Sequence, residues 1–403
     1  MNTGMSSGPW PAFAEDEIEA AVRILRSGKV NYWTGREGRS FEEEFAASTE
    51  CKHAVAVANG TLALECALRA LGVGPGDDVV TSSRTFIASA SSAVMLGARP
   101  IFADVDSESQ NVTAASIQEV LTTRTRAIVV VHLAGWPCEM DEILALARGR
   151  GIRVLEDCAQ AQGATYKGRP VGSMGDLAAF SFCQDKVMTT AGEGGMVTTN
   201  SDELWNAVWS VKDHGKSYNA VYLRQHAPGF RWLLESFGTN ARMTEVQSAI
   251  GRVALGKVPG RIAVSRAFAQ MLTSRLASYP GLRVPQPPSH VEHSYYKYYA
   301  FIRPERLVPG WTYNRIIEEI NAEGIQCFNG SCSELYQEKA FPPEWRPAKR
   351  LQVAQQLGET SLMFLVHPTL SEQYIMATSD AVGKVISAAT QMPADESHVC
   401  RRS

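Results

Sequence analysis

The sequence has no long apolar run, no marked excess of one charge and no paired cysteines, and each absence excludes a class of protein. No apolar stretch approaches the roughly 18–20 residues that a helix needs to cross a bilayer. The formal net charge is −3, without the basic footprint that a nucleic-acid backbone requires. The N-terminus is polar and acidic after Met1, unlike a signal peptide. We therefore expect a cytoplasmic protein that binds neither nucleic acid nor a membrane.

The eight cysteines are scattered along the chain, and none forms a C-x-x-C pair. Several lie in apolar segments that are predicted as strand or helix, so we expect reduced, buried thiols. His132, His214 and His367 also lack the spacing of zinc ligands. We therefore expect no metal site.

What is present is a globular composition, with 45% hydrophobic and 20% charged residues in 403. That length is sufficient for two domains. Between Cys51 and about residue 200, short apolar runs alternate with helical segments such as Thr61–Leu71, Ala115–Leu121 and Glu142–Arg148. This alternation predicts an α/β domain, residues 1–255, with a mostly parallel sheet that is covered on both faces. The seven predicted strands are Ala54–Ala58, Val79–Thr81, Ile101–Ala103, Ala127–Val131, Ile152–Leu155, Ala178–Phe182 and Gly195–Thr199.

After about residue 200 the pattern changes to longer helices with few strands, which predicts a smaller α+β domain at residues 256–403. We expect the helix after Pro259 to link the two domains, and the ends of the chain at 1–8 and 394–403 to be frayed. The predicted helices are Asp202–Lys212, Met243–Leu255, Arg261–Leu276, Asn314–Ala322 and Ser379–Met392, and the predicted strands are Tyr295–Ile302 and Phe364–Val366.

A lysine and an acid follow neighbouring strands of the predicted sheet. Lys186 lies between a strand that ends near Phe182 and a glycine-rich turn, and the strand about thirty residues earlier ends in Glu156-Asp157. Ligands of such sheets bind at the carboxyl ends of the strands. Pyridoxal phosphate chemistry needs this arrangement, because an amine must form a Schiff base and a carboxylate must keep the pyridine nitrogen protonated.

Further polar and aromatic residues follow other strand ends, and each also has a simpler structural explanation. Gly60 and Thr61 open a helix and could hold a phosphate or only cap the helix. Ser181 could bind the same phosphate or face solvent. Phe86 could stack on a flat ring or pack in the core. Gln160, one helical turn after Asp157, could reach a ring oxygen or be solvated.

As a set, these residues resemble the DegT/DnrJ/EryC1/StrS family of sugar aminotransferases, which belong to the fold type I pyridoxal phosphate class. The resemblance covers about residues 10 to 390. The matching motifs are Asn59-Gly-Thr-Leu-Ala-Leu64, Thr85-Phe86, Gly97-Ala-Arg-Pro-Ile-Phe-Ala-Asp-Val105, Val131-His-Leu-Ala-Gly135, Glu156-Asp-Cys-Ala-Gln-Ala-Gln-Gly163, Phe180-Ser-Phe182 with Lys186, Gly192-Glu-Gly-Gly195 and Gly238-Thr-Asn-Ala-Arg-Met243.

The resemblance implies a role for each residue. Lys186 would be the Schiff-base lysine and Asp157 the partner of the pyridinium nitrogen. The remaining cofactor contacts would be Gln160 to the ring hydroxyl, Phe86 on the ring, and Gly60, Thr61 and Ser181 to the phosphate. Asn240 would reach the phosphate of the neighbouring subunit, so that a homodimer shares its active sites. From the residues alone, Asn240 is most simply the N-cap of the following helix.

The reaction implied by the resemblance moves an amino group from L-glutamate to a keto-sugar, most simply a UDP-, dTDP- or GDP-linked 3- or 4-keto-deoxysugar. This sequence departs from the family at Gln162, where histidine is common, and at Cys183, where histidine or an aromatic residue is frequent. Both departures bear on substrate fit.

Three alternatives stay open. The first is an aminotransferase acting on a cyclitol or other non-nucleotide ring ketone. The second is a dehydratase of the same fold, against which Lys186 argues because that branch carries histidine instead. The third is a pyridoxal-phosphate-binding regulatory protein without turnover, against which the absence of a helix-turn-helix extension argues.

Residues that contact the substrate are harder to predict. Asn31-Tyr-Trp-Thr-Gly35 could line a sugar site, although packing of the N-terminal segment explains it slightly better. His214 and Tyr218 could lie near the substrate. The cationic candidates for the diphosphate are Arg242, Lys216, Arg224 and Arg231.

Overall fold

The structure is a computed structural model, and it describes residues 8–390. The predicted frayed ends at 1–8 and 394–403 lie outside the described residues except for Gly8, and so does the predicted helix at residues 391 and 392. None of the helices within 8–390 is both long enough and apolar enough to cross a membrane.

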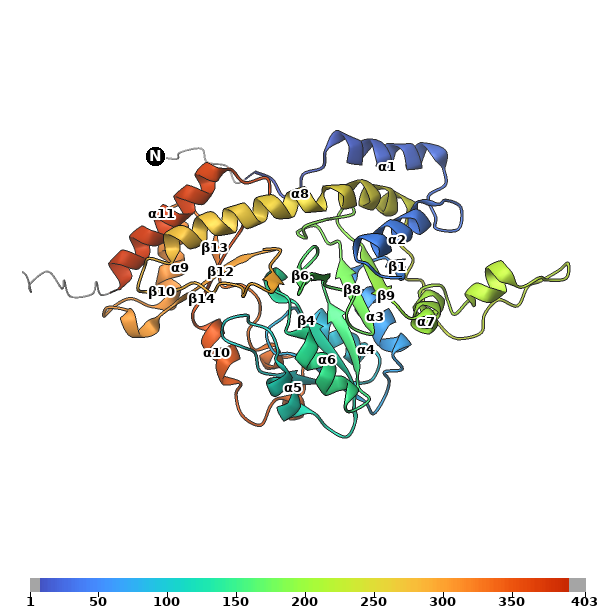
Figure 1. Cartoon of the computed structure of the whole chain (residues 1–403), viewed down its shortest axis with the longest axis horizontal. Coiled ribbons are helices and arrows are strands. Elements are labelled where there is room, and N and C mark those ends of the chain that lie inside the picture. The colour runs from blue at the N-terminus through green and yellow to red at the C-terminus, as the bar shows by residue number, and fades with distance from the viewer. Residues whose placement is uncertain (1–7, 391–403) are drawn as a thin grey trace, which may run out of the picture.

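A seven-stranded sheet forms the centre of the larger part of the molecule (Figure 1). Its strand order is β1-β9-β8-β5-β4-β2-β3, and every strand runs in one direction except β9, which is antiparallel to both β1 and β8. This confirms the predicted mostly parallel sheet and all seven predicted strands. The strands are β1 (His53–Val57), β2 (Asp78–Ser82), β3 (Arg99–Ala103), β4 (Thr125–Val131), β5 (Arg153–Asp157), β8 (Leu177–Ser181) and β9 (Gly195–Thr199).

Both faces of this sheet are covered because successive residues of a strand point to opposite faces. In β4, Ile128 and Val130 belong to one apolar core, whereas Ala127 and Val129 belong to the other. The first core is closed by α2 (Glu37–Ser48), α5 (Ala114–Val120), α6 (Met140–Arg148) and part of α8 (Glu245–Leu276). The second is closed by α3 (Gly60–Ala70), α4 (Ala88–Met95) and α7 (Asp202–Lys212).

The C-terminal part has its own sheet and its own core. An antiparallel sheet in the order β10-β12-β14-β13 packs with α9, α11 and the second half of α8. Its elements are β10 (Leu282–Arg283), β12 (Tyr298–Ile302), α9 (Tyr313–Ala322), β13 (Cys327–Phe328), β14 (Ser361–Phe364) and α11 (Glu372–Ala389). The remaining elements are α1 (Glu15–Ser27), β6 (Thr165–Tyr166), β7 (Arg169–Pro170), β11 (Val291–Glu292) and α10 (Gln352–Gly358).

The prediction of two helices separated at Pro259 is wrong, because α8 continues through this proline. A proline inside a helix removes one hydrogen bond and costs about 3 kcal/mol. Packing on both sides outweighs this cost. Val258 and Ile262 are buried in the core of the large sheet, and Phe268 and Leu272 in the C-terminal core. The predicted domain boundary after residue 255 lies within this helix, and the division into domains stays a prediction.

Two C-terminal elements begin earlier than predicted. β14 starts at Ser361 instead of Phe364, where it pairs with β12. α11 starts at Glu372 instead of Ser379, because the Ser371 side chain accepts a hydrogen bond from the Tyr374 amide and caps the helix.

The chain after α7 leaves the body of the molecule. Residues 224–239, which we call the arm, follow a single π-helical turn at Asn219–Leu223, and this region extends away from the sheet (Figure 1). The arm carries exposed apolar side chains, with Trp232 81% and Phe237 90% exposed. It is secured at its base by an ion pair between Arg224 and Glu235 at 2.7 Å.

Candidate active site

Strand ends bring most of the predicted site residues to one edge of the large sheet. Asp157 is the last residue of β5 and pairs with Ala179 of β8, two residues before Ser181 ends that strand. Because β1 and β8 are both antiparallel to β9, β1 ends at the same edge, and its turn leads into Gly60. The expected convergence is therefore present in the structure.

Gly60 and Ser181 lie in direct contact at the start of α3. A Cβ atom added to Gly60 would lie 2.6 Å from the Ser181 Cβ, so the position accepts only glycine without movement. Asn59 caps the helix, its Oδ1 accepting from the Leu62 amide at 2.9 Å and its carbonyl from the Ala63 amide at 3.0 Å. The amides of Gly60 and Thr61 remain for an anion, and the positive end of a helix favours one.

Asp157 is a buried carboxylate that has no cationic side chain within ion-pair distance among residues 8–390. Its Oδ2 accepts from the Ser89 hydroxyl at 2.7 Å, and its Oδ1 from the Ala159 amide at 3.1 Å. Burial raises the pKa of Asp157, although these hydrogen bonds oppose the shift. A buried carboxylate in this state is stabilised by a cation, and a pyridinium nitrogen would supply one.

Ser89, which the sequence reasoning missed, connects Asp157 to Thr85. The hydroxyls of Thr85 and Ser89 lie 2.9 Å apart. Since Ser89 uses its proton for Asp157, Thr85 is the donor of that second bond. The four-residue spacing of two hydroxyls at the start of a helix was the available signal. Between them, Phe86 is 66% exposed and therefore free to stack on a flat ligand.

Lys186 is half-buried beyond the end of β8 and faces residues from the C-terminal part of the chain. Its Nζ lies 3.4 Å from the Tyr296 hydroxyl and 3.8 Å from Asp185 Oδ1. The Tyr296 hydroxyl also donates to the other oxygen of Asp185. Neither Tyr296 nor Asp185 was predicted as a site residue. The available signals were that Tyr296 lies in a run of tyrosines and that Asp185 directly precedes Lys186.

The structure gives less direct evidence for the predicted roles of Gln160 and Asn240. Gln160 Oε1 accepts from the Ala134 amide at 2.8 Å, which leaves its amide nitrogen for a ligand. Asn240 is exposed and pairs with the backbone of Asp213. It is not the cap of α8, because Thr244 fills that position with a capping box to Gln247. The roles of Gln160 and Asn240 at a cofactor stay predictions.

Several candidates for substrate contact are engaged in packing. Tyr32 is buried and donates to Glu42 at 3.0 Å, and Trp33 stacks on Tyr222 at 6.1 Å, as expected for packing of the N-terminal segment. Tyr218 packs against Trp209 at 5.2 Å. Three of the cationic candidates are already in ion pairs: Arg242 and Lys216 with Asp213, and Arg224 with Glu235.

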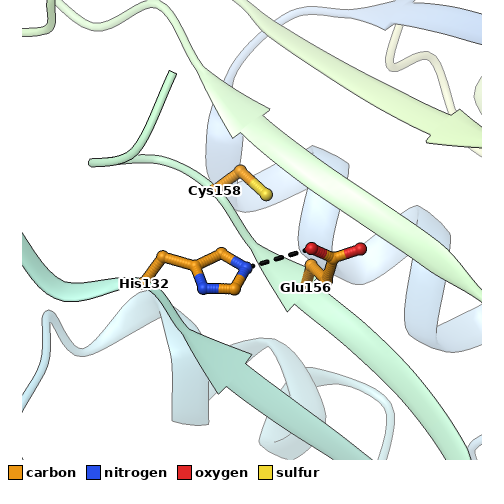
Figure 2. A group of neighbouring side chains, drawn as sticks. All are labelled: His132, Glu156 and Cys158. Carbon is orange, nitrogen blue, oxygen red and sulfur yellow. Dashed lines mark hydrogen bonds and ion pairs between the residues drawn. The ribbon is translucent and has the colours of Figure 1, made fainter. Parts of the chain in front are cut away.

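His132, Glu156 and Cys158 form a buried group beside the site, with the side chains close enough to suggest metal ligands (Figure 2). Their hydrogen bonds argue otherwise. His132 Nδ1 accepts from the Cys138 amide at 3.0 Å, so its Nε2 carries the proton that is donated to Glu156, also at 3.0 Å. Glu156 further accepts three backbone amides, from Gly172, Met174 and Gly175. Because His132 Nδ1 and both Glu156 oxygens are engaged in these hydrogen bonds, we interpret His132 and Glu156 as structural residues that fix the backbone next to Asp157.

The residues present fit pyridoxal phosphate. The helix start at Gly60 and Thr61 suits a phosphate, the buried Asp157 suits a pyridinium nitrogen, and Lys186 supplies an amine. The observation that carries this fit is the buried carboxylate of Asp157 without a cation.

Comparisons with known proteins agree with this chemistry. A sequence model of the DegT/DnrJ/EryC1/StrS aminotransferase family matches residues 11–382. The chain is 37% identical to GDP-perosamine synthase of Caulobacter vibrioides over 88% of this chain and 92% of that protein. It is 33% identical to UDP-N-acetyl-3-dehydro-alpha-D-glucosamine 3-aminotransferase of Acidithiobacillus ferrooxidans, over 92% and 94% respectively. An aminotransferase structure from Psychrobacter cryohalolentis matches with a TM-score of 0.92 and 54% identity, covering 94% of this chain and 99% of that one.

Proposed function

The chain belongs to the DegT/DnrJ/EryC1/StrS aminotransferase family and is a pyridoxal-phosphate-dependent enzyme, and from this premise we propose that it aminates a nucleotide-linked keto-sugar with L-glutamate as the donor. The match to the family model confirms the resemblance that the sequence motifs indicated. The donor, the sugar and the position of the new amine belong to the proposal.

The cofactor, when bound, supplies an electron-accepting ring that stabilises negative charge at the carbon losing its proton. The residues of this chain then have separate tasks. We propose that Asp157 would hold the proton at the pyridine nitrogen, and that Lys186 Nζ would take the proton from the donor α-carbon. Gly60, Thr61 and Ser181 would bind the phosphate, Phe86 would cover the ring, and Gln160 would bind the ring hydroxyl.

Two relatives support a nucleotide-linked sugar as the acceptor. One is named for a GDP-linked sugar and the other for a UDP-linked 3-dehydro sugar, and each matches nearly the whole chain. Because the two names carry different nucleotides, the nucleotide is left open here, as is the choice between C3 and C4.

We also propose a homodimer in which Asn240 contributes to the site of the partner subunit. The arm supports this, because Trp232 and Phe237 expose large apolar surfaces that a free monomer would leave in water. Asn240 follows the arm directly in the sequence, so a partner subunit that covers the arm would approach Asn240 as well. Sedimentation should give a dimer, and Asn240→Ala should weaken cofactor binding; a monomer with full affinity would refute the shared site. A cytoplasmic location is part of the proposal as well.

The central experiment separates the two halves of the reaction. L-glutamate converts the purified enzyme to its pyridoxamine form, and a panel of GDP-, UDP- and dTDP-linked 3- and 4-keto-sugars is then offered, with free cyclitol ketones as the alternative acceptors. Return of the original visible absorbance identifies the acceptor. A response to free ketones alone would favour the non-nucleotide alternative, and release of water without consumption of glutamate would favour a dehydratase.

Lys186→Ala tests the catalytic lysine. This variant should lose the visible absorbance of the lysine-linked cofactor and all turnover. Retained absorbance with full turnover would refute the assignment of Lys186.

A further inference from the structure

A second lysine, Lys297, lines a pocket next to Lys186. Lys297, just before β12, lines a small, partly open pocket together with Asp185, Tyr296 and His367. Asp185 and Val187, the two neighbours of Lys186 in the sequence, both line this pocket. The pocket therefore adjoins the catalytic lysine.

Lys297 and Lys186 share one aromatic ring. The Nζ atoms lie 4.6 Å and 4.7 Å from the centre of the Tyr296 ring, respectively. In the described part of the chain, the Lys297 ammonium makes no ion pair and no side-chain hydrogen bond. Asp185 is the anion of this pocket, but it already accepts from Tyr296 and lies 3.8 Å from Lys186.

The charge on Lys297 is held partly out of water without a dedicated counter-ion. Burial lowers the pKa of Lys297, with Asp185 opposing the shift and Lys186 adding to it. His367 cannot share the positive charge, since burial and Lys297 lower the pKa of His367 to about 4. Arg261, which packs on Trp10 of the same pocket, is paired with Glu17 at 3.1 Å. Among residues 8–390, Lys297 is thus a cation next to this pocket without an ion-pair partner, and such a group is stabilised by an incoming anion.

We propose that the Lys297 ammonium binds a carboxylate of the amino-acid donor while Lys186 acts as the base on that donor. This inference rests on the proposed aminotransferase function, because it is the donor that brings a carboxylate to this position. The interaction would orient the α-carbon toward Lys186 Nζ and would be absent from the keto-sugar half-reaction unless the sugar itself carries an acid group.

The experiment compares Lys297→Met with the wild-type enzyme in each half-reaction. The apparent Kd for L-glutamate should rise about 10- to 100-fold, as for loss of a charge-assisted hydrogen bond, with the keto-sugar half-reaction nearly unchanged. Lys297→Arg should recover part of the affinity. Lys339→Met, which removes an exposed lysine outside this pocket, is the matched control and should change nothing.

Different donors identify the carboxylate. Equal losses with L-glutamate, L-glutamine and L-alanine would assign Lys297 to the α-carboxylate, and a loss with L-glutamate alone would assign it to the side-chain carboxylate. A loss confined to the keto-sugar half-reaction, or unchanged glutamate affinity, would overturn the proposal.

A binding measurement without turnover keeps this inference separate from the proposed function. Glutarate has two carboxylates and no amine, and its binding to the cofactor-loaded enzyme can be measured by calorimetry. Weaker glutarate binding in Lys297→Met but not in Lys339→Met supports the carboxylate site even if no tested amino acid is converted, in which case the proposed function fails alone. Equal glutarate binding in both variants overturns the carboxylate site.

Discussion

The hydroxyl of Ser89 offers a way to change the protonation of Asp157 without touching either the lysine or the acid. In Ser89→Ala the carboxylate loses one of its two hydrogen-bond donors, the one at 2.7 Å, and keeps the Ala159 amide. Hydrogen bonds to charged groups contribute about 1.5–3 kcal/mol. Since one pKa unit corresponds to about 1.4 kcal/mol, the pKa of Asp157 should rise by about one to two units.

The direction of this change fixes the expected pH dependence. In its proposed role, Asp157 must be ionised to hold a proton at the pyridine nitrogen, and burial already raises its pKa. If the pKa of Asp157 rises further, its carboxylate becomes protonated at a higher pH than in the wild-type enzyme when the solution is acidified. The acid limb of the proposed half-reaction with L-glutamate should therefore move to higher pH by about one to two units, as measured by stopped-flow absorbance across a pH series.

Ser92→Ala is the matched control for this prediction. Ser92 lies on the same helix, is fully buried, and its hydroxyl has no hydrogen-bond partner in the described structure. Its removal should leave the acid limb in place. If Ser89→Ala leaves the limb unchanged or moves it to lower pH, the assignment of the Thr85–Ser89–Asp157 chain is refuted.

Two further substitutions test the supports of the site. Gly60→Ala places a Cβ 2.6 Å from the Ser181 Cβ, and this overpacking should weaken cofactor affinity about 10- to 100-fold in an absorbance titration. Gly256→Ala is the control, because Gly256 has open space around it, and it should leave the affinity unchanged. Equal affinities of the two variants would argue against a phosphate site at Gly60. Glu156→Gln should lower the free energy of unfolding by about 3 kcal/mol in urea, because three backbone amides and His132 lose a carboxylate acceptor. Burial opposes ionisation of Glu156, but these hydrogen bonds outweigh it and lower the pKa, so the stabilisation is present above about pH 4.5 and is lost as the pH falls further. The free energies of unfolding of the wild-type and Glu156→Gln proteins should therefore converge in acid. A difference between them that persists in acid would contradict this account.

The parts of the molecule that the sequence predicts are those controlled by local pattern. Alternating apolar runs located all seven strands, and the position of a residue after a strand placed Asp157 and Gly60 at the same edge. Both inferences need only strand periodicity and the rule that parallel strands end together.

The missed features depend on contacts between distant parts of the chain. Pro259 predicts a helix break by its own chemistry, but two separate cores hold the helix on either side of it. Tyr296 and Lys297 lie 110 residues or more from Lys186 in the sequence, and no local pattern connects them. Asn240 precedes a helix in the sequence, yet the local capping box selects Thr244 as the cap.

The structure places the two departures from the family pattern, Gln162 and Cys183, in different surroundings. This difference indicates which of the two positions could influence the choice of sugar. Gln162 is buried and its amide donates to Met188 Sδ at 3.3 Å, so it supports the turn that follows Lys186 instead of facing a substrate. Cys183 is half-buried, and its carbonyl accepts from the Lys186 amide at 3.1 Å. Because Cys183 lies in the turn that carries Lys186 and is partly exposed, whereas Gln162 is buried, we expect position 183, more than position 162, to influence which ring the enzyme accepts.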